Sequence, residues 1–283
     1  MSSASSLLGV LFGLASALSW GTGDFCGGLA TRRTPVRGVL ILSQLTGVLL
    51  LLAAALILKD PLPSMRPLIF GGLAGLCGAC GLAALYSGLA GGRMGLIAPL
   101  TAVISAALPV LAASFTQGLP PLMQLIGFAL AMAAVWLLAV GDDRAPLRGR
   151  MLVLPLVAGL GFGLFFILIA QASGQALIWP LIAARMAAMA FLALAGLMQA
   201  GRIRPDLRHL PLIVAAGIFD AGGNAFFALA ARFGRLDVAA VLSSLYPAAT
   251  VLLAWLILRE YLSARQWTGL LAALGALALI AEG

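Results

Sequence analysis

The sequence predicts an all-α membrane protein with ten transmembrane helices, arranged as two inverted-topology repeats of five helices each. Of its 283 residues, 63% are apolar and only 9% are charged, and the mean hydropathy is +1.12. Soluble domains carry about 25% charged residues, so a soluble globular protein is excluded. In a bilayer the backbone polar groups need partners within the chain, which leaves helices or closed barrels. The apolar runs of this chain are too long for the strands of a barrel.

Apolar segments of membrane-spanning length account for nearly the whole chain. A helix of about 20 apolar residues crosses the ~30 Å hydrocarbon core of a bilayer. The connections between the segments are short, so any function has to lie within the helical bundle. The ten predicted helices run approximately over residues 7–30, 38–58, 67–91, 95–115, 121–140, 151–171, 177–200, 210–231, 238–258 and 264–281.

The second half of the chain repeats the first at a constant shift of 142 residues. Coincidences of Pro, Gly and polar residues carry this argument: Pro63 falls on Pro205, Arg66 on Arg208, Gly92-Arg93 on Gly234-Arg235, and Gln124 and Gly127 on Gln266 and Gly269. We therefore predict two repeats, residues 1–141 and 143–283. Because five crossings leave the second copy starting on the opposite side of the membrane, the copies must be inverted. Inverted repeats are an architecture of secondary transporters.

The first apolar segment has the length and apolar core of a signal peptide but not its positively charged start. Residues 1–6 contain no Lys or Arg. Leu14 and Gly21 also recur 142 positions later as Leu156 and Gly163. We therefore expect this segment to be retained as the first helix of the first repeat.

Basic residues are distributed unevenly between the two sides of the predicted bundle. All Lys and Arg residues except Arg185 lie in the connections, twelve in the odd-numbered connections and four in the even-numbered ones. No amphipathic face combines them with aromatic residues, so the net charge of +8 does not indicate nucleic acid binding. Since cytoplasmic loops of membrane proteins are rich in Lys and Arg, the bias predicts cytoplasmic odd-numbered connections and both termini outside.

The sequence contains few residues suited to catalysis or to metal binding. Cys26, Cys77 and Cys80 lie inside predicted helices, and the last two form a single CxxC pair. A structural zinc site takes four ligands, and the only histidine, His209, lies in a connection. We interpret the cysteines as packing residues. The sequence has no Gly-rich phosphate loop, HExxH motif or nucleophile elbow, so we predict neither an enzyme nor a cofactor.

Three ionisable residues lie inside predicted membrane segments: Asp24, Arg185 and Asp220. A charge at the bilayer centre is costly and normally faces the bundle interior or a cavity. At about 1.5 Å per residue, Asp24 lies roughly 10 Å, Asp220 roughly 16 Å and Arg185 roughly 24 Å from the odd-connection face. Asn224 is one turn from Asp220 at the depth of Arg185, so Arg185 could reach Asn224 directly and Asp220 by extending.

These residues have a functional and a structural interpretation. We predict a polar contact between the seventh and eighth helices, formed by Arg185, Asp220 and Asn224, which either binds substrate or is an ion pair that fixes helix packing. Asp24 has no predicted partner. It is either a cation- or proton-responsive carboxylate facing a cavity or a hydrogen-bonded group near a helix end.

Helix irregularities mark a second group of candidate binding residues. Pro247 lies in the predicted ninth helix, just after Ser243 and Tyr246, and a proline inside a helix removes a hydrogen bond and kinks it. Interrupted helices at corresponding positions of two halves point to transporter binding sites, although the prolines of the fourth and ninth helices do not coincide here. Trp20 and its counterpart Phe162 lie near the middle of the membrane. We interpret them either as the walls of a cavity or as ordinary core residues.

Several motifs resemble one membrane protein family. The segment Ala228 to Pro247, the stretch Ala254 to Glu260 and the motif Gln266-Trp-Thr-Gly269 resemble the second EamA domain of the drug/metabolite transporter (DMT) superfamily. Trp20-Gly21 and Gly23-Asp24-Phe25 are similar to the opening of the first EamA domain.

The resemblance implies ten helices in two inverted five-helix units around a central cavity that alternates its opening. Many relatives carry Asn where Asp24 stands, and Gly118 replaces the Glu expected opposite Glu260. The family moves amino acids, other metabolites, nucleotide sugars and drugs, so the resemblance does not choose the substrate. Members are usually drawn with cytoplasmic termini, contrary to the charge bias of this chain.

The sequence therefore predicts a multi-pass secondary transporter of the inner (cytoplasmic) membrane, and most simply an exporter of small metabolites such as amino acids. Its predicted partners are a small-molecule substrate, the lipid bilayer and possible coupling protons, with the oligomeric state left open. A flippase of a lipid-linked substrate and a non-transport membrane scaffold are the alternatives. The buried charges weigh against a scaffold, which has no reason to place them together.

Overall fold

A computed structural model describes residues 3–90, 94–139, 149–197, 207–259 and 261–282, and these residues are almost entirely helical, with no strand among them. Four positions used in the sequence comparison, Gly92, Arg93, Pro205 and Glu260, lie outside the described residues. The helices are α1 (Ser3–Thr31), α2 (Val36–Ile57), α3 (Met65–Ala90), α4 (Met94–Thr116), α5 (Leu122–Ala139), α6 (Gly149–Ser173), α7 (Ile178–Leu197), a short 3-10 helix η1 (Leu207–His209), α8 (Leu210–Phe233), α9 (Leu236–Ser243), α10 (Tyr246–Leu258) and α11 (Ala264–Glu282).

The helices have the length and composition of membrane spans. Within the described residues, seven spans are long and apolar enough to cross a bilayer, one of them made of α9 and α10 together. Three shorter apolar stretches, in α4, α5 and α7, cover Leu100–Thr116, Leu122–Leu138 and Ile178–Leu194. The chain is thus an all-α membrane protein, as predicted, while the number of ten crossings stays a prediction.

Proline determines where several helices begin. Pro35 caps α2, and Pro211 and Pro247 lie in the first turns of α8 and α10. Proline is suited to these positions because its missing N–H has no helical acceptor there. The predicted ninth helix, 238–258, corresponds to one apolar span, Leu236–Leu258, which is interrupted between α9 and α10 just before Pro247. Pro247 cannot donate to the carbonyl of Ser243, and α9 ends at that residue.

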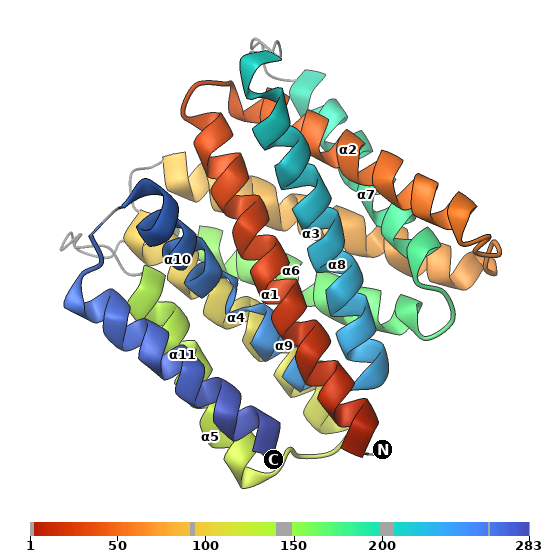
Figure 1. Cartoon of the computed structure of the whole chain (residues 1–283). Helices are drawn as coiled ribbons and strands as arrows, with labels where there is room; N and C mark the ends of the chain where they lie inside the picture. The colour runs from red at the N-terminus through yellow and green to blue at the C-terminus, as the bar shows by residue number, and fades with distance from the viewer. Residues whose placement is uncertain (1–2, 91–93, 140–148, 198–206, 260, 283) are drawn as a thin grey trace.

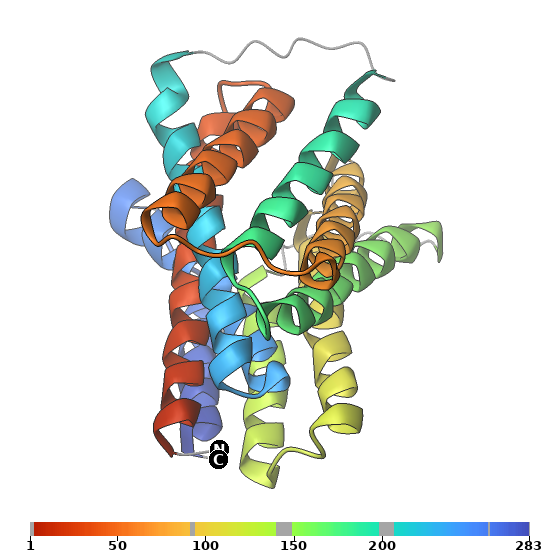
Figure 2. The same cartoon turned by 90° about the vertical axis from the view of Figure 1, so that its right-hand side faces the viewer.

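The two halves of the chain interlock rather than lying side by side as separate domains. In Figures 1 and 2 the long α1 runs along α8, α3 lies beside α6, and both termini lie at the same end of the molecule. The α5–α11 pair flanks this arrangement on one side, and α2 and α7 flank it on the other (Figure 1). Each of these pairs joins a helix of the first half to one of the second.

The interlocking contacts repeat with the same shift as the sequence. Gly223 of α8 lies against Trp20 of α1, and a Cβ at this glycine would collide with the indole ring. Gly81 of α3, 142 residues earlier, lies against Phe162 of α6, the counterpart of Trp20. Glycine is needed at both positions because a large ring from the other half lies directly against the helix backbone.

Hydrogen bonds across the α1–α8 contact tie the halves together. The hydroxyl of Ser16 donates to the carbonyl of Gly223 at 2.9 Å, and that of Ser19 donates to the carbonyl of Phe219 at 2.6 Å. Such bonds hold helices in lipid, where apolar side chains gain little by leaving the surrounding hydrocarbon.

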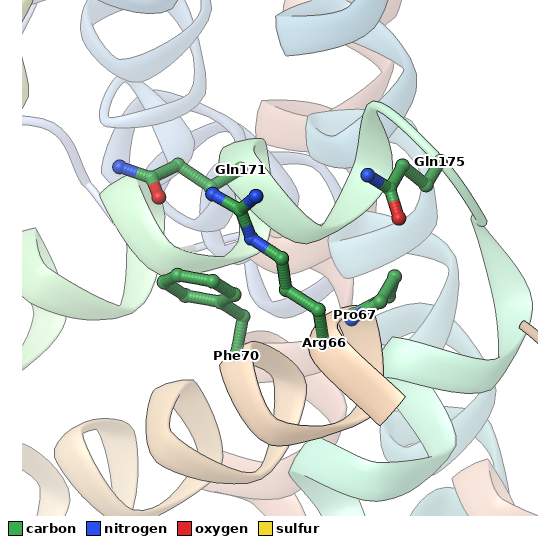
Figure 3. Close-up of a pocket in the computed structure, with 5 residues that line it drawn as sticks. All are labelled: Arg66, Pro67, Phe70, Gln171 and Gln175. Atoms are coloured by element: carbon green, nitrogen blue, oxygen red, sulfur yellow. The ribbon is translucent and has the colours of Figure 1, made fainter. Parts of the chain in front are cut away.

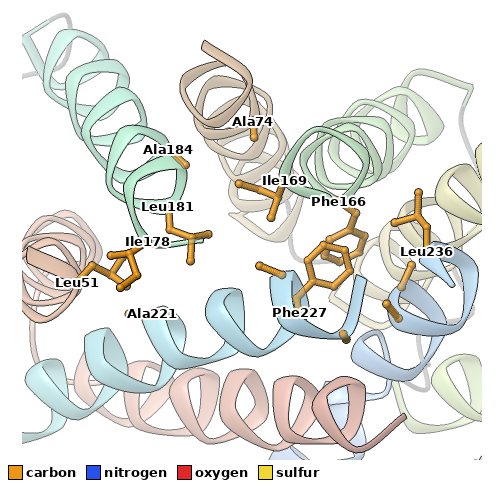
Figure 4. Close-up of a cluster of buried hydrophobic side chains, with 14 of the residues drawn as sticks. Leu51, Ala74, Phe166, Ile169, Ile178, Leu181, Ala184, Ala221, Phe227 and Leu236 are labelled. Atoms are coloured by element: carbon orange, nitrogen blue, oxygen red, sulfur yellow. The ribbon is translucent and has the colours of Figure 1, made fainter. Parts of the chain in front are cut away.

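An apolar core fills the middle of the molecule. Figure 4 shows Phe166 and Ile169 of α6 packed towards Leu181 of α7, Phe227 of α8 and Leu236 of α9. Phe227 and Ile169 are completely buried. The core includes Ala184 and Ala221, which are next in sequence to two of the polar residues described below.

Candidate functional site

A charged pair inside the membrane joins three helices. The Nη2 of Arg185, on α7, lies 2.7 Å from Oδ2 of Asp220 on α8. Its Nη1 donates to Oε1 of Gln44, on α2, at 2.8 Å. The Arg185 side chain is only 5% exposed, whereas that of Asp220 is 42% exposed. The guanidinium is therefore enclosed, and the carboxylate remains open on one side.

A glycine on α2 makes room for the guanidinium. A Cβ placed on Gly47 would lie 2.5 Å from Nη1 and 2.7 Å from Cζ of Arg185. Any side chain at this position would push Arg185 away from Asp220. Sequence reasoning missed both Gln44 and Gly47, although an amide in an apolar segment with a glycine three residues later was a usable signal.

Asn224 takes a different partner from the one we expected. Its side-chain amide donates to the main-chain carbonyl of Asp220, one turn earlier on α8, at 2.8 Å. Arg185 bonds Asp220 and Gln44, and no hydrogen bond joins it to Asn224 within the described residues. We expected Arg185 to contact Asn224 directly and Asp220 only by extending. It contacts Asp220 instead, because a hydrogen bond to its own helix satisfies the Asn224 amide. We call Gln44, Arg185, Asp220 and Asn224 the polar cluster.

Asp24 lies on α1 beside the polar cluster, and its side chain is exposed. At the adjacent Gly23, a Cβ would lie 3.3 Å from the main-chain nitrogen of Asp220, so α1 passes close to this part of α8. Within the described residues no ion pair engages Asp24, whereas Asp220 is paired with Arg185.

An aromatic cluster lies one helical turn along α1 from Asp24. The Trp20 ring stacks with Phe166 and Phe227 at centroid distances of 5.7 and 6.1 Å, and the two phenylalanine rings are 4.6 Å apart. Trp20 and Asp24, four residues apart, share a face of α1. We call Trp20, Phe166 and Phe227 the aromatic cluster; together with Asp24 it places apolar and acidic groups next to each other.

The interrupted helix meets α1 on another face. The Thr250 hydroxyl donates to the carbonyl of Gly21 at 3.1 Å and to that of Tyr246 at 3.2 Å. A Cβ at Gly21 would lie 2.5 Å from the Tyr246 carbonyl oxygen. Ser243 is completely buried, and its hydroxyl has no partner within the described residues. Ser243 and Tyr246 therefore lie at the junction of α9 and α10, where this span adjoins α1.

A second buried charge, missed by sequence reasoning, lies at the end of the molecule that carries the termini. Asp237 is fully buried and pairs with Arg235 at 2.7 Å. Arg235 also donates to the carbonyls of Gln117 at 3.2 Å and Gly118 at 2.7 Å, in the α4–α5 turn. Gln117 in turn accepts the main-chain N–H of Leu236 at 3.1 Å. We call this group the Arg235 clamp; it joins the two halves.

The Arg235 clamp ties the two halves together at one end of the bundle. Along α8 it lies about 15 residues from Asp220, or roughly 22 Å at 1.5 Å per residue. The start of α1 is also packed there, because a Cβ at Gly9 would lie 2.7 Å from Cα of Gly234. No group of three or more His, Cys, Asp or Glu residues able to hold a metal occurs in the part of the chain that the structure describes.

Comparisons with known proteins agree with this architecture. The EamA-like transporter family matches residues 7–140 and again residues 149–281, one stretch in each predicted repeat. One solved crystal structure superposes with a TM-score of 0.78 at 18% sequence identity, covering 97% of this chain and 96% of its own. A comparison with curated proteins gave no match. The resemblance found in the sequence motifs is confirmed, and the repeat boundaries at 141 and 143 stay a prediction.

Proposed function

Since the chain belongs to the EamA-like transporter family, we propose that it is a secondary transporter that exports small metabolites such as amino acids across the cytoplasmic membrane. The observation that carries this proposal is the polar cluster and Asp24 beside the aromatic cluster. An amino acid offers charged groups at one end and an apolar body at the other. A site with the same division can hold both parts at once.

The asymmetry of the site under the 142-residue shift supports an amphipathic substrate. The counterparts of Asp24, Arg185 and Asp220 in the other half are Phe166, Ser43 and Gly78. The duplicated fold thus carries charge on one side and aromatic or small residues on the other. With Arg185 already neutralised by Asp220, the remaining carboxylate of Asp24 favours a substrate with an ammonium group.

In this proposal the two ends of the bundle open in turn, which is alternating access. The Arg235 clamp ties the two halves together at the end that carries the termini, while Asp24 is exposed and the Asp220 side chain is 42% exposed. In this proposal, opening towards the termini separates α8–α9 from the α4–α5 turn, which Arg235 joins. The clamp contacts would then break together, which gives the bundle two discrete states.

Uptake and efflux by the full chain reconstituted in liposomes tests the transport proposal. Labelled amino acids, other amines and carboxylates should be compared with and without a pH gradient, using protein-free liposomes as the control. We expect saturable flux of an amphipathic amine. A folded protein that moves no member of such a panel would favour a scaffold, and flux only of lipid-linked compounds would favour a flippase.

Proton coupling through Asp24 is the sharpest part of the proposal. Asp24→Asn keeps the shape of the side chain but cannot gain or lose a proton in the working range. We expect the variant to fold and bind substrate, since many family members carry Asn there, while its flux no longer responds to a pH gradient. Lys59→Asn, which changes one charge outside the bundle interior, is the control. If wild-type and Asp24→Asn flux respond alike, Asp24 is not the coupling residue.

A further inference from the structure

A hollow lies between α3 and α6, away from the polar cluster. It has a volume of about 110 Å³ and is lined by Arg66, Pro67 and Phe70, from the first turns of α3, and by Gln171 and Gln175, from the end of α6 and just beyond it. Figure 3 shows the Arg66 side chain extending across the hollow towards Gln171, with Phe70 below it. Helix ends of both halves meet here, so the hollow lies at an edge of the membrane span.

Arg66 brings a positive charge to this hollow that no acidic residue neutralises. Its guanidinium lies 5.7 Å from the centroid of the Phe70 ring, which holds it over the hollow. No carboxylate lines the hollow, and within the described residues no ion pair engages Arg66. Arg185 and Arg235, by contrast, are each paired with an aspartate. The amides of Gln171 and Gln175 add further hydrogen-bond donors.

Two apolar stripes run from the hollow along the membrane span. On α3, Ile69, Leu73 and Leu76 are 57%, 47% and 41% exposed, and their spacing places them on the same face as Arg66. On α6, the exposed Val157, Leu160 and Leu164 continue to Gln171 at the spacing of one helix face. The helices pack closely between the stripes, where a Cβ on Gly78 would touch Phe165 at 3.3 Å.

We propose that this hollow binds the phosphate of an anionic phospholipid, with an acyl chain lying along the stripes of α3 and α6. A guanidinium is a strong phosphate ligand because it donates parallel, charge-assisted hydrogen bonds. Basic pockets between membrane helices bind lipid headgroups in this way. We commit to the lipid because the hollow lies at the edge of the membrane span, where lipid headgroups are concentrated, and adjoins apolar stripes that a soluble phosphate cannot contact.

The site is formed at only one of the two equivalent contacts between the halves, the α3–α6 contact and not the α8–α1 contact. The counterpart of Arg66 is Arg208, but the counterparts of Gln171 and Gln175 are Leu29 and Arg33. The amide donors are therefore absent from the equivalent seam. The bound lipid would lie where α3 of the first half packs on α6 of the second, and would stabilise that contact.

The test compares lipids by the thermal unfolding of the full chain in a neutral detergent. The midpoint temperature should rise with added dioleoylphosphatidylglycerol but not with dioleoylglycerol, which has the same chains without the phosphate. Native mass spectrometry should retain one phosphatidylglycerol per chain. For Arg66→Ala, the lipid concentration giving half of the shift should increase about tenfold or more, the effect of losing one charge-assisted hydrogen bond.

A matched control separates this site from general charge effects. Lys59 also lies in the α2–α3 connection, at a φ of 49° that Asn tolerates, so Lys59→Asn removes a charge nearby without touching the hollow. It should keep the wild-type response. Should Arg66→Ala fold poorly, Gln171→Leu with Gln175→Leu serves as the second variant and should also weaken the response.

Three results would overturn the proposal. The first is a wild-type response to phosphatidylglycerol in both the Arg66 and the glutamine variants. The second is an equal response to dioleoylglycerol, which would mean that only the apolar stripes bind. The third is an equal shift with sodium phosphate at the ionic strength of a sodium chloride control, which would make a soluble phosphate the ligand.

Discussion

At the scale of single residues, the two members of the membrane-buried pair are not equivalent. Arg185 is enclosed, while Asp220 is open on one side. Removing Asp220 strands a buried positive charge, whereas removing Arg185 leaves a carboxylate that can still be solvated. Breaking a fully buried pair costs about 3–5 kcal/mol, and this figure applies more closely to the loss of Asp220.

We therefore predict that Asp220→Ala lowers the unfolding midpoint and the folded yield more than Arg185→Ala does. The double variant should recover part of the loss, because no unpaired charge then remains. Thermal unfolding and size-exclusion chromatography of the three proteins measure this. If Arg185→Ala folds like the wild type yet loses transport, its main role is in binding the substrate, and the structural interpretation fails.

Gly47 allows a second test at the residue scale. Ala exceeds Gly in helix propensity by about 1 kcal/mol, so Gly47→Ala would stabilise α2 if local propensity decided. We predict the opposite, because the new Cβ would lie 2.5 Å from the Arg185 guanidinium. Gly72→Ala is the matched control, since no atom lies within 4 Å of a Cβ at that helical position. The unfolding midpoint should fall for Gly47→Ala and rise or stay level for Gly72→Ala.

At the scale of the elements, the Arg235 clamp holds α8 and α9 against the α4–α5 turn. Arg235→Ala would leave Asp237 buried without its cation and should cost about 3 kcal/mol. We expect a lower unfolding midpoint and, in the proposed transport cycle, easier opening at the end that carries the termini. Thiol labelling of a Val238→Cys reporter, in a variant whose Cys26, Cys77 and Cys80 are replaced by Ala, measures that opening, because Val238 is buried beside the clamp.

Arg232→Ala provides the control for this prediction. Arg232 lies near the end of α8, is exposed, and takes no part in the clamp. Labelling and stability should stay at wild-type values. A clamp variant that labels no faster than this control and unfolds at the wild-type temperature would show that the Arg235 contacts do not hold the two halves.

At the scale of the whole molecule, both termini lie at one end of the bundle (Figure 2). The excess of basic residues in the odd-numbered connections predicts that this end faces away from the cytoplasm. A carboxy-terminal reporter that is active only outside the cytoplasm should then give a signal, and a cytoplasmic reporter should give none. Strong cytoplasmic activity would reverse the orientation and would leave the transporter assignment intact.

Features that can be read directly along the sequence were enough to determine that this is a helical membrane protein and that its chain is duplicated. Apolar length, charge density and the 142-residue shift are visible in the chain itself, because a bilayer requires long apolar helices wherever they pack. The EamA resemblance also came from contiguous motifs around Asp24 and Pro247 and was confirmed by both family matches. Depth along the membrane placed Asp220 within reach of Arg185 but gave Asn224 as its nearer partner, which the structure does not show.

Only the tertiary structure decided which neighbours these residues have. Gln44 and Gly47 meet Arg185 because α2 packs between α7 and α8, and Arg235 reaches Gly118 because the two halves interlock. Depth gives a residue's position along one axis, whereas a hydrogen bond also needs the rotation of each helix and the identity of the adjacent one. Those two quantities arise when side chains of distant segments pack against each other, so no local pattern in the sequence contains them.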